Sequence, residues 1–422
     1  MNEQAELALP HSPGLLRRIA DEFGTPVYIY DEARLRHIAE ELLNFPNPFG
    51  LTPRFAMKAC PSGPIVKLLS DWGLHIDASS GYEARRVMAL GISPTQIRLT
   101  TQEHDPEFAE LVEAGVLFTA CSMRQLNEYG RRFPNSQVSL RVNPGLGSGQ
   151  LNRLNTGGAA SSFGVWHEDL GHVQELCEEY GLCVSTLHSH MGAGGDPDVW
   201  VQCARLVLAV AARFPEVTTV NLGGGFKVAR MPYEESADLT RIGQRISVEF
   251  ERFADSHGRK LHLEIEPGTF MFANSGVILA EVQDLTSTGE EGYSFIKLNT
   301  GMNDFVRPGM YGAQHPLWIV SADTEKRPLR DYIVVGHCCE TGDILTPAPA
   351  DPEALMPRRL PQAKIGDLFL IGGAGAYASG FSVKNYNSFP ESPEVLVRES
   401  GELVLIRRRQ TLEQITCNEV FR

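Results

Sequence analysis

The middle of the chain alternates between two patterns of hydrophobic and polar positions. Short β-branched or apolar runs end in a polar residue or glycine, and each is followed by a longer segment with helical periodicity. Segments such as SGPIVKLLSDWG and SGYEARRVMALG begin with Ser and end at Gly, which is typical of capped helices. The strand-like runs number eight: Pro53–Lys58, Gly73–Ser80, Ile97–Thr100, Val116–Ser122, Gln137–Pro144, Val184–Gly192, Val217–Gly225 and Lys260–Gly268.

This alternation predicts an α/β fold with parallel strands joined by right-handed crossovers. Eight such units close into a (β/α)8 barrel, which is the fold we expect for residues 32–273. A doubly wound open sheet is the alternative.

The sequence pattern changes at Val277, after which strand-like runs follow one another without long intervening helices. The last of them, EVLVRESGELVLIRR, predicts a hairpin around a Ser-Gly turn. The early run Thr25–Tyr30 precedes the barrel and could join the same sheet. We therefore expect an all-β domain made of residues 1–31 and 274–422.

The charge and cysteine content narrow the choice of partners and compartment. The chain has 38 Lys and Arg against 52 Asp and Glu, a net charge of −14, which disfavours nucleic acid and anionic lipid. The basic cluster Arg407–Arg409 follows an apolar run and is interpreted as a solvated strand end. The eight cysteines contain no C-x-x-C pair, and neither a signal peptide nor a membrane-spanning run is recognisable. These features predict a cytoplasmic protein that binds no membrane.

A barrel of this kind places its catalytic and binding residues at the carboxyl ends of the strands, so the candidate residues are expected there. Lys58 follows an apolar run that would take its amine out of water and favour the neutral form needed in a Schiff base. A lysine that extends from the strand end into solvent is the alternative. Gly223, Gly224 and Gly225 could turn backbone N–H groups toward a phosphate, although a glycine turn without a ligand is equally compatible.

A buried acid and two histidines complete these candidates. Glu266 stands where an apolar barrel interior is expected, so it needs a partner such as a pyridinium nitrogen or, alternatively, a structural salt bridge. His188 and His190 lie two positions apart on the expected sixth strand. No further histidine or cysteine pairs have suitable spacing, so we expect no metal, and His190 fits a ring stacked on a planar cofactor better.

In this order, the motifs resemble those of the pyridoxal 5'-phosphate (PLP)-dependent decarboxylases of the alanine racemase-like fold, specifically those acting on meso-2,6-diaminopimelate. The resemblance covers nearly the whole chain and includes the ending IRRRQTLEQI. It rests on nine motifs: FAMKAC around Lys58, RVNPG at Arg141–Gly145, NTGG at Asn155–Gly158, HSHMGAG at His188–Gly194, LGGGF at Leu222–Phe226, EIEPG at Glu264–Gly268, RPGMYG at Arg307–Gly312, CETGD at Cys339–Asp343 and GAY at Gly375–Tyr377.

The resemblance implies a set of cofactor-binding roles. Lys58 would hold PLP covalently, His190 would stack on its ring, and Glu266 would pair with its ring nitrogen. The phosphate would lie against the three glycines. The implied cofactor-binding set is Lys58, His190, Gly223, Gly224, Gly225, Glu266, Gly268, Thr269 and Tyr377.

The resemblance also implies a shared active site in a homodimer. Cys339, as a catalytic residue, and Glu340 would reach into the partner's site, near the reacting carbon and the distal amino group of the amino-acid substrate. Arg307 and Tyr311 would contact the distal carboxylate, and Tyr377 would close on cofactor and substrate. The expected reaction converts meso-2,6-diaminopimelate to L-lysine and CO2.

Two positions depart from the family pattern. Thr269 stands where the family has an arginine, and Ala193 where it has a serine, so two anion ligands are missing. A neutral hydrogen bond contributes about 0.5–1.5 kcal/mol against about 1.5–3 kcal/mol for a charged one. The alternatives are therefore a decarboxylase of a related amino acid, of a carrier-bound one or of a polyamine precursor, and, less in keeping with Glu266, Lys58 and Cys339, a racemase or a non-catalytic PLP-binding homologue.

Overall fold

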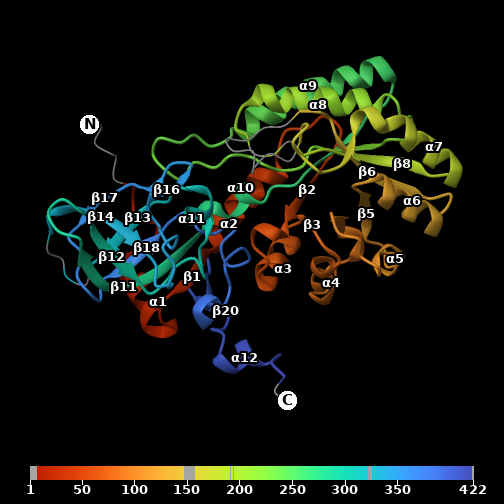
Figure 1. Cartoon of the computed structure of the whole chain (residues 1–422). Coiled ribbons are helices and arrows are strands. Elements are labelled where there is room, and N and C mark those ends of the chain that lie inside the picture. The colour runs from red at the N-terminus through yellow and green to blue at the C-terminus, as the bar shows by residue number, and fades with distance from the viewer. Residues whose placement is uncertain are drawn as a thin grey trace. The chain divides into compact units, whose positions relative to one another are not determined.

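A computed structural model describes residues 7–146, 157–190, 192, 194–321, 323 and 326–420. The chain divides into two compact units (Figure 1). The barrel unit comprises Arg36–Val228 and Glu235–Met271, and the β unit comprises Met1–Leu35, Ala229–Glu234 and Phe272–Arg422. Ala193 and the first half of the NTGG motif lie outside the described residues.

Eight parallel strands form the centre of the barrel unit. Pairing between β5 and β6 closes the ring, so the open-sheet alternative is wrong and the predicted barrel is confirmed. A short extra strand, β7 (Val165–Trp166), pairs with β6 outside the ring. The ring strands are β2 (Leu51–Ala56), β3 (His75–Ala78), β4 (Ile97–Thr100), β5 (Leu117–Ala120), β6 (Gln137–Asn143), β8 (Cys183–His188), β9 (Thr219–Asn221) and β10 (His262–Ile265).

Helices alternate with these strands, as the capping signals predicted (Figure 1). The Ser80 and Ser122 side chains accept hydrogen bonds from the first-turn amides of α4 and α6. Helix α7 ends at Gly181, which adopts the left-handed conformation with φ 65°. The helices are α2 (Glu32–Leu43), α3 (Gly63–Asp71), α4 (Gly81–Ala89), α5 (Phe108–Glu113), α6 (Met123–Arg132), α7 (Leu170–Tyr180), α8 (Pro197–Ala211), α9 (Leu239–His257) and α10 (Thr269–Phe272).

Seven barrel strands end earlier than the sequence predicted, and three of these ends change where a candidate site residue lies. Strand β2 stops at Ala56, and Lys58 lies in a 3₁₀ turn, Met57–Ala59, closed by the Cys60 amide donating to the Met57 carbonyl. Strand β8 stops at His188, so His190 lies in the following loop and not on the strand. Strand β10 stops at Ile265, one residue before Glu266. The chemistry-bearing residues thus follow the parallel hydrogen-bond ladder, where the backbone is free to turn.

The β unit contains a nine-stranded sheet into which the N-terminal strand is inserted. Strand β1 pairs antiparallel with β11 and parallel with β19, which confirms that the early run joins the C-terminal sheet. Strands β19 and β20 form the predicted hairpin. The sheet strands are β1 (Val27–Asp31), β11 (Gly276–Ser287), β12 (Ser294–Leu298), β13 (Leu317–Val320), β14 (Leu329–Val335), β17 (Arg358–Pro361), β18 (Leu368–Ile371), β19 (Glu394–Val397) and β20 (Leu403–Arg407).

Short elements and one longer helix complete the β unit. Helix α1 (Pro13–Phe23) buries Leu16 and Ile19 in the apolar core that includes Ile29 and Val395. The others are α11 (Arg307–Tyr311), α12 (Leu412–Thr416), and the paired strands β15 (Pro347–Ala348) and β16 (Asp351–Leu355). The expectation of successive strands without long intervening helices after Val277 therefore holds for the described residues.

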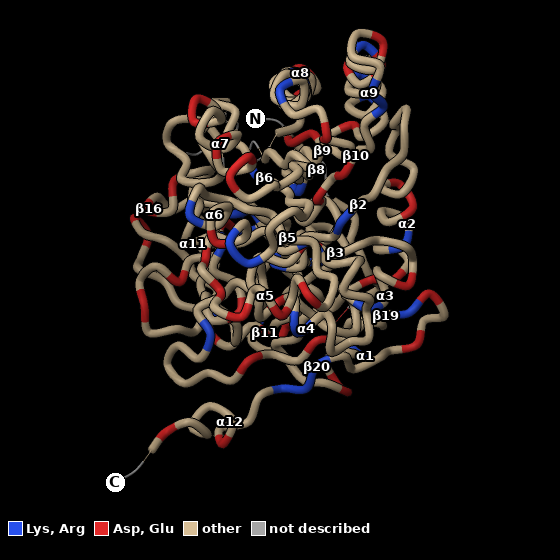
Figure 2. The backbone as a smooth tube through the Cα atoms, turned by 90° about the vertical axis from the view of Figure 1, so that its right-hand side faces the viewer, with Lys and Arg blue, Asp and Glu red and all other residues tan. Residues whose placement is uncertain are grey.

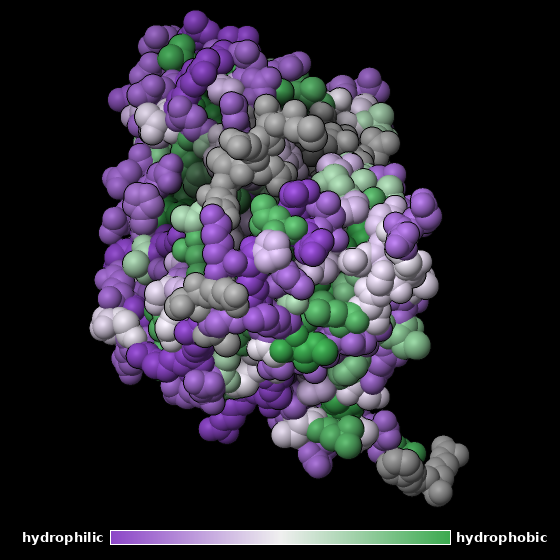
Figure 3. Space-filling view, turned by 90° about the vertical axis from the view of Figure 1, so that its left-hand side faces the viewer, coloured by the Kyte–Doolittle hydropathy of each residue, from purple (hydrophilic) through white to green (hydrophobic). Residues whose placement is uncertain are grey.

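The surface carries mixed charge. Acidic and basic residues are interspersed along the outer helices, α9 among them (Figure 2). On the face in Figure 3, hydrophilic side chains predominate and hydrophobic ones form separate groups. The basic cluster is partly structural, because Arg407 contacts Glu391 at 3.0 Å and Arg409 donates to the Pro26 carbonyl at 2.8 Å. In the part of the chain described, no helix combines the length and apolar character needed to cross a membrane.

Candidate active site

Lys58 projects from the 3₁₀ turn after β2. Its Nζ lies 3.9 Å from Asp77 Oδ2 and 3.4 Å from Ser79 Oγ, while 46% of its side chain is exposed. The expectation that an apolar strand removes this amine from water is therefore wrong, because the strand ends two residues earlier and only the neighbouring Met57 and Ala59 are buried. The amine is accessible and lies beside a buried carboxyl group.

Asp77 and Glu266 are two buried acids in opposite electrostatic states. Burial, together with the Glu266 charge, raises the pKa of Asp77 well above its usual range. Burial also acts to raise the pKa of Glu266, but His188 and then Lys58 outweigh it and lower that pKa below its usual range. Glu266 therefore stays ionised at neutral pH, and the His188 Nε2 atom lies 3.3 Å from its Oε2.

Glu266 belongs to a polar layer inside the barrel that the sequence analysis missed. The Asn221 amide donates to Glu266 Oε1 at 2.7 Å and to Glu264 Oε2 at 3.1 Å. Glu264 in turn accepts hydrogen bonds from Arg54 and Arg98 at 2.8–3.1 Å. The expectation of an apolar interior at this level is wrong, because two arginines compensate the acids. The missed signal was period-two spacing, since Glu264 and Glu266 share one side of the chain.

His190 packs directly on the glycine turn after β9. A Cβ atom on Gly223 would lie 2.7 Å from the His190 Nδ1 atom, and one on Gly224 would lie 2.0 Å from the Glu266 carbonyl oxygen. Gly223 and Gly225 have positive φ, 68° and 98°. The Gly223 amide donates to Asn221 Oδ1 at 2.8 Å. Burial lowers the pKa of His190 well below 6.5, so its ring is neutral.

The remaining barrel residues line the same strand ends. Gly268 packs against Ala59, where a Cβ atom would meet the alanine Cβ at 3.2 Å, and Thr269 begins α10 half-buried. Arg141 is buried, with its guanidinium 4.8 Å from the centre of the Phe163 ring. Among the described residues, no acceptor lies within hydrogen-bond distance of the Arg141 Nη2 atom. An unmatched buried cation of this kind lowers the pKa of nearby acids and favours anions.

The β unit brings together the residues expected to recognise substrate. The Arg307 guanidinium lies 5.8 Å from the centre of the Tyr311 ring. Phe381 stacks on Tyr311 at 6.3 Å and meets Tyr377 edge-on at 6.1 Å. Tyr377 has φ 53°, which is uncommon for a side chain of this size and is typical of functional sites.

Cys339 and Glu340 lie in an exposed loop after β14. The Cys339 amide donates to Asn387 Oδ1 at 2.8 Å, and Glu340 Oε1 accepts from the Gly342 amide at 3.1 Å. Asp343 supports the loop through the Cys338 amide, which donates to it at 2.8 Å. The thiol and the carboxylate are therefore presented to solvent on a hydrogen-bonded loop.

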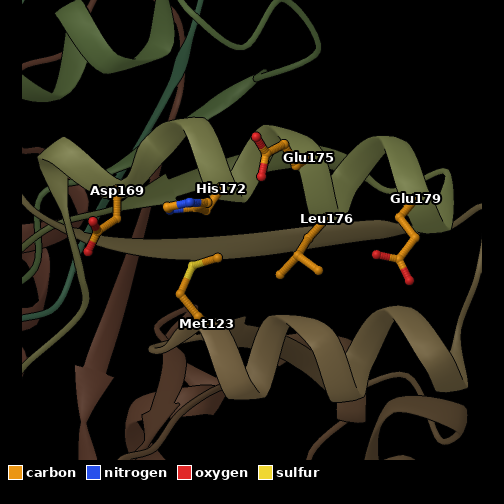
Figure 4. A pocket seen from close by; sticks show the side chains of 6 residues that line it. All are labelled: Met123, Asp169, His172, Glu175, Leu176 and Glu179. Atoms are coloured by element: carbon orange, nitrogen blue, oxygen red, sulfur yellow. The ribbon is translucent and has the colours of Figure 1, made fainter.

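A separate hollow lies between α6 and α7 on the barrel unit (Figure 4). It contains none of the predicted site residues. Met123 comes from α6, and the others from or beside α7: Asp169, His172, Glu175, Leu176 and Glu179. Within the described ranges, no three His, Cys, Asp or Glu side chains are grouped as metal ligands.

Comparisons with known proteins identify the family to which the chain is similar. Residues 35–273 match the family "Pyridoxal-dependent decarboxylase, pyridoxal binding domain". The chain is 33% identical over 424 residues to a diaminopimelate decarboxylase of Streptomyces coelicolor, covering 97% of this chain and 94% of the relative. It is 34% identical over 415 residues to that of Escherichia coli K12, covering 96% of each. A crystal structure of a diaminopimelate decarboxylase is 32% identical, with a TM-score of 0.89 and coverage of 97% of this chain and 99% of that one.

Proposed function

The chain belongs to the pyridoxal-dependent decarboxylases, and from this membership we propose that it converts meso-2,6-diaminopimelate to L-lysine and CO2. It is a carboxy-lyase whose cofactor is PLP. The relatives that support the substrate are matched over nearly their full length. The structural observation that carries the proposal is the buried, ionised Glu266 at the mouth of the barrel.

The barrel residues fit the cofactor chemically. An accessible amine at Lys58, a neutral ring at His190 and an ionised acid at Glu266 are the groups that a pyridine aldehyde requires. The unmatched Arg141 nitrogen and the glycine turn after β9 suit an anion. We assign Lys58, His190, Gly223, Gly224, Gly225, Glu266, Gly268, Thr269 and Tyr377 to cofactor binding.

Each side chain then has a defined task. The cofactor supplies an electron-withdrawing ring that stabilises the negative charge left on Cα when its carboxylate departs. Glu266 would hold a ring nitrogen in its protonated form, because its own pKa is held low by His188 and Lys58. Lys58 would hold the cofactor through its accessible Nζ, beside Asp77 and Ser79. A proton returns to Cα from Cys339 Sγ or Lys58 Nζ.

Substrate recognition and assembly follow the same proposal. Arg307 and Tyr311 bind the distal carboxylate, Glu340 binds the distal ammonium, and Tyr377 contacts substrate and cofactor. Because Cys339 and Glu340 stand on an exposed loop, they suit a homodimer in which each subunit completes its partner's site. We further propose residues 32–273 as the cofactor domain, residues 1–31 and 274–422 as the second domain, and the cytoplasm as the location.

Product analysis tests the reaction. Purified PLP-loaded enzyme is incubated with meso-diaminopimelate, ornithine, arginine and lysine, and products are identified by mass spectrometry. We expect L-lysine and CO2 from diaminopimelate alone. Borohydride reduction followed by peptide mapping should place the pyridoxyl group on Lys58. Lysine formation absent under conditions where the cofactor is bound would refute the substrate, and a label on another lysine would refute the cofactor assignment.

Glu266→Gln tests the observation that carries the proposal. The amide is nearly isosteric but cannot hold a ring nitrogen protonated, so PLP should still bind while kcat falls by about 100-fold or more. Glu251→Gln, an exposed acid on α9, is the matched control. Near-normal kcat in Glu266→Gln would mean that Glu266 is only a structural partner of His188.

A further inference from the structure

The β unit contains an arginine and a histidine near Arg307, namely Arg230 and His315, that the sequence motifs did not single out. Arg230 lies in the segment Ala229–Glu234, which belongs to this unit. Its Nε donates to the Gly373 carbonyl at 3.1 Å. The preceding carbonyl, Gly372, lies 2.9 Å from His315 Nδ1. Two consecutive peptide groups therefore hold the Arg230 guanidinium and the His315 ring side by side.

Hydrogen-bonding capacity in this group is unused. In the described part of the chain, the buried nitrogens Arg230 Nη2, Arg307 Nε and His315 Nε2 have no hydrogen-bond partner. Buried donors are nearly always satisfied in proteins, and leaving one unmet costs about 1–3 kcal/mol. Arg230 Nη2 and Arg307 Nε are two such donors, and His315 Nε2 is an acceptor because the proton of the neutral ring is on Nδ1, so together they indicate a polar ligand from outside the chain.

The group also carries an excess of positive charge, from Arg230 and Arg307. Arg307 lies close enough to Arg230 that, after burial, its charge is the main influence lowering the Arg230 pKa, which falls to about 9. Burial, Arg230 and Arg307 likewise lower the His315 pKa well below 6.5. The acid beside Arg230, Glu234, accepts the Arg230 and Met231 backbone amides at 2.7 and 3.0 Å. No ion pair between this acid and the Arg230 side chain occurs among the described residues.

We propose that Arg230 is a substrate-binding residue that acts with Arg307 to bind the carboxylate remote from the reacting carbon. This inference rests on the proposed function, because a diamino dicarboxylic acid presents such a carboxylate and a monocarboxylic diamino acid does not. Two guanidinium groups with open N–H positions match the planar, multiply accepting carboxylate. His315 is neutral and its Nδ1 donates to the Gly372 carbonyl, so it helps position the pair and presents Nε2 as an acceptor, while the two arginines supply the donors.

The main experiment compares Arg230→Met with wild type. Methionine retains most of the apolar length but removes the charge, so KM for meso-diaminopimelate should rise by about 10- to 100-fold. Inhibition by the product L-lysine, which keeps the distal carboxylate, should weaken in parallel, whereas inhibition by 1,5-diaminopentane, which has no carboxylate, should change by less than about threefold. Arg359→Met, an exposed arginine in the same unit paired with Asp331, is the matched control and should leave these constants unchanged.

A binding measurement separates this inference from the reaction itself. Calorimetric titration of the holoenzyme with pimelate, a dicarboxylate without amino groups, should show binding that Arg230→Met weakens by at least tenfold. Hexanoate, with one carboxylate, should bind weakly to both proteins. If wild type fails to decarboxylate diaminopimelate but pimelate binding depends on Arg230, the proposed substrate fails and the carboxylate site stands.

Stability distinguishes a binding arginine from a structural one. Relief of repulsion from Arg307 should leave the melting temperature of Arg230→Met equal to or above that of wild type, and pimelate should raise it only in wild type. If Arg230→Met does not fold, Arg230→Lys replaces it as the test. Lysine keeps the charge but cannot form the two parallel hydrogen bonds of a guanidinium, so KM should rise several-fold with unchanged folding. Unchanged KM and pimelate affinity in a folded variant, or a melting temperature lowered with no loss of affinity, would overturn the inference.

Discussion

Replacing Glu264 by glutamine tests the polar layer that supports the barrel site. Glu264 is 4% exposed, and its two oxygens accept hydrogen bonds from Arg54 at 2.8 Å and Arg98 at 2.9 Å. Glutamine keeps the shape but removes the charge, so two buried guanidinium groups lose their counterion. Removing one partner of such a buried group costs about 3–5 kcal/mol.

The pKa of Glu264 gives an independent magnitude. Burial acts to raise it, but Arg98 and Arg54 outweigh burial and lower it from 4.5 to about 2. At about 1.36 kcal/mol per pKa unit, this fall corresponds to about 3.4 kcal/mol. Because the folded pKa lies below the unfolded one, the stabilisation is complete above about pH 5 and is lost as the pH falls toward 2. It should decline to about 2.6 kcal/mol at pH 4 and about 1.4 kcal/mol at pH 3.

Urea-induced unfolding of the cofactor-free chain, followed by circular dichroism at pH 7, 4 and 3, measures this dependence. We expect Glu264→Gln to be about 3 kcal/mol less stable than wild type at pH 7, with the difference shrinking at acid pH. In thermal unfolding the loss corresponds to about 4 °C if the whole chain melts cooperatively. Glu251→Gln, on the barrel surface, should match wild type. A loss below 1 kcal/mol at pH 7, or a loss that persists undiminished at pH 3, would refute the ion-pair explanation.

Three further outcomes follow from the contacts described. Asn221→Leu removes the amide donor to Glu266, so the acid limb of the kcat profile should move to higher pH, and an unmoved limb would show that Asn221 does not tune Glu266. Because the pKa of Asp77 is raised in the folded chain, the free energy of unfolding of wild type should fall as the pH rises above about 4. Asp77→Asn should remove this fall, which urea unfolding at several pH values would measure. Mixing inactive Lys58→Ala with inactive Cys339→Ala should restore about a quarter of wild-type activity, because half of the freely exchanging dimers are mixed and each has one intact site. No recovery despite demonstrated exchange would place Lys58 and Cys339 in one chain's site.

The sequence by itself determined the fold and most of the chemistry. Eight alternating strand and helix signals specified the barrel, because hydrophobic periodicity and capping residues are local properties that each segment carries alone. The position of Glu266 between Ile265 and Pro267, at the end of an expected barrel strand, likewise identified a buried acid. Motif order then identified the cofactor and the reaction class, which the family match supports.

Tertiary structure decided what surrounds those residues. Lys58 is accessible and Glu266 is held ionised because of where β2 and β10 end and which side chains face them from β3, β8 and β9. The pairing of Arg54 and Arg98 with Glu264 joins segments 166 or more residues apart. Arg230 meets His315 through the carbonyls of two adjacent glycines, which no spacing in the sequence encodes. Charge balance in a buried site is a sum over neighbours in space, so only the folded chain reveals which ions are compensated and which await a ligand.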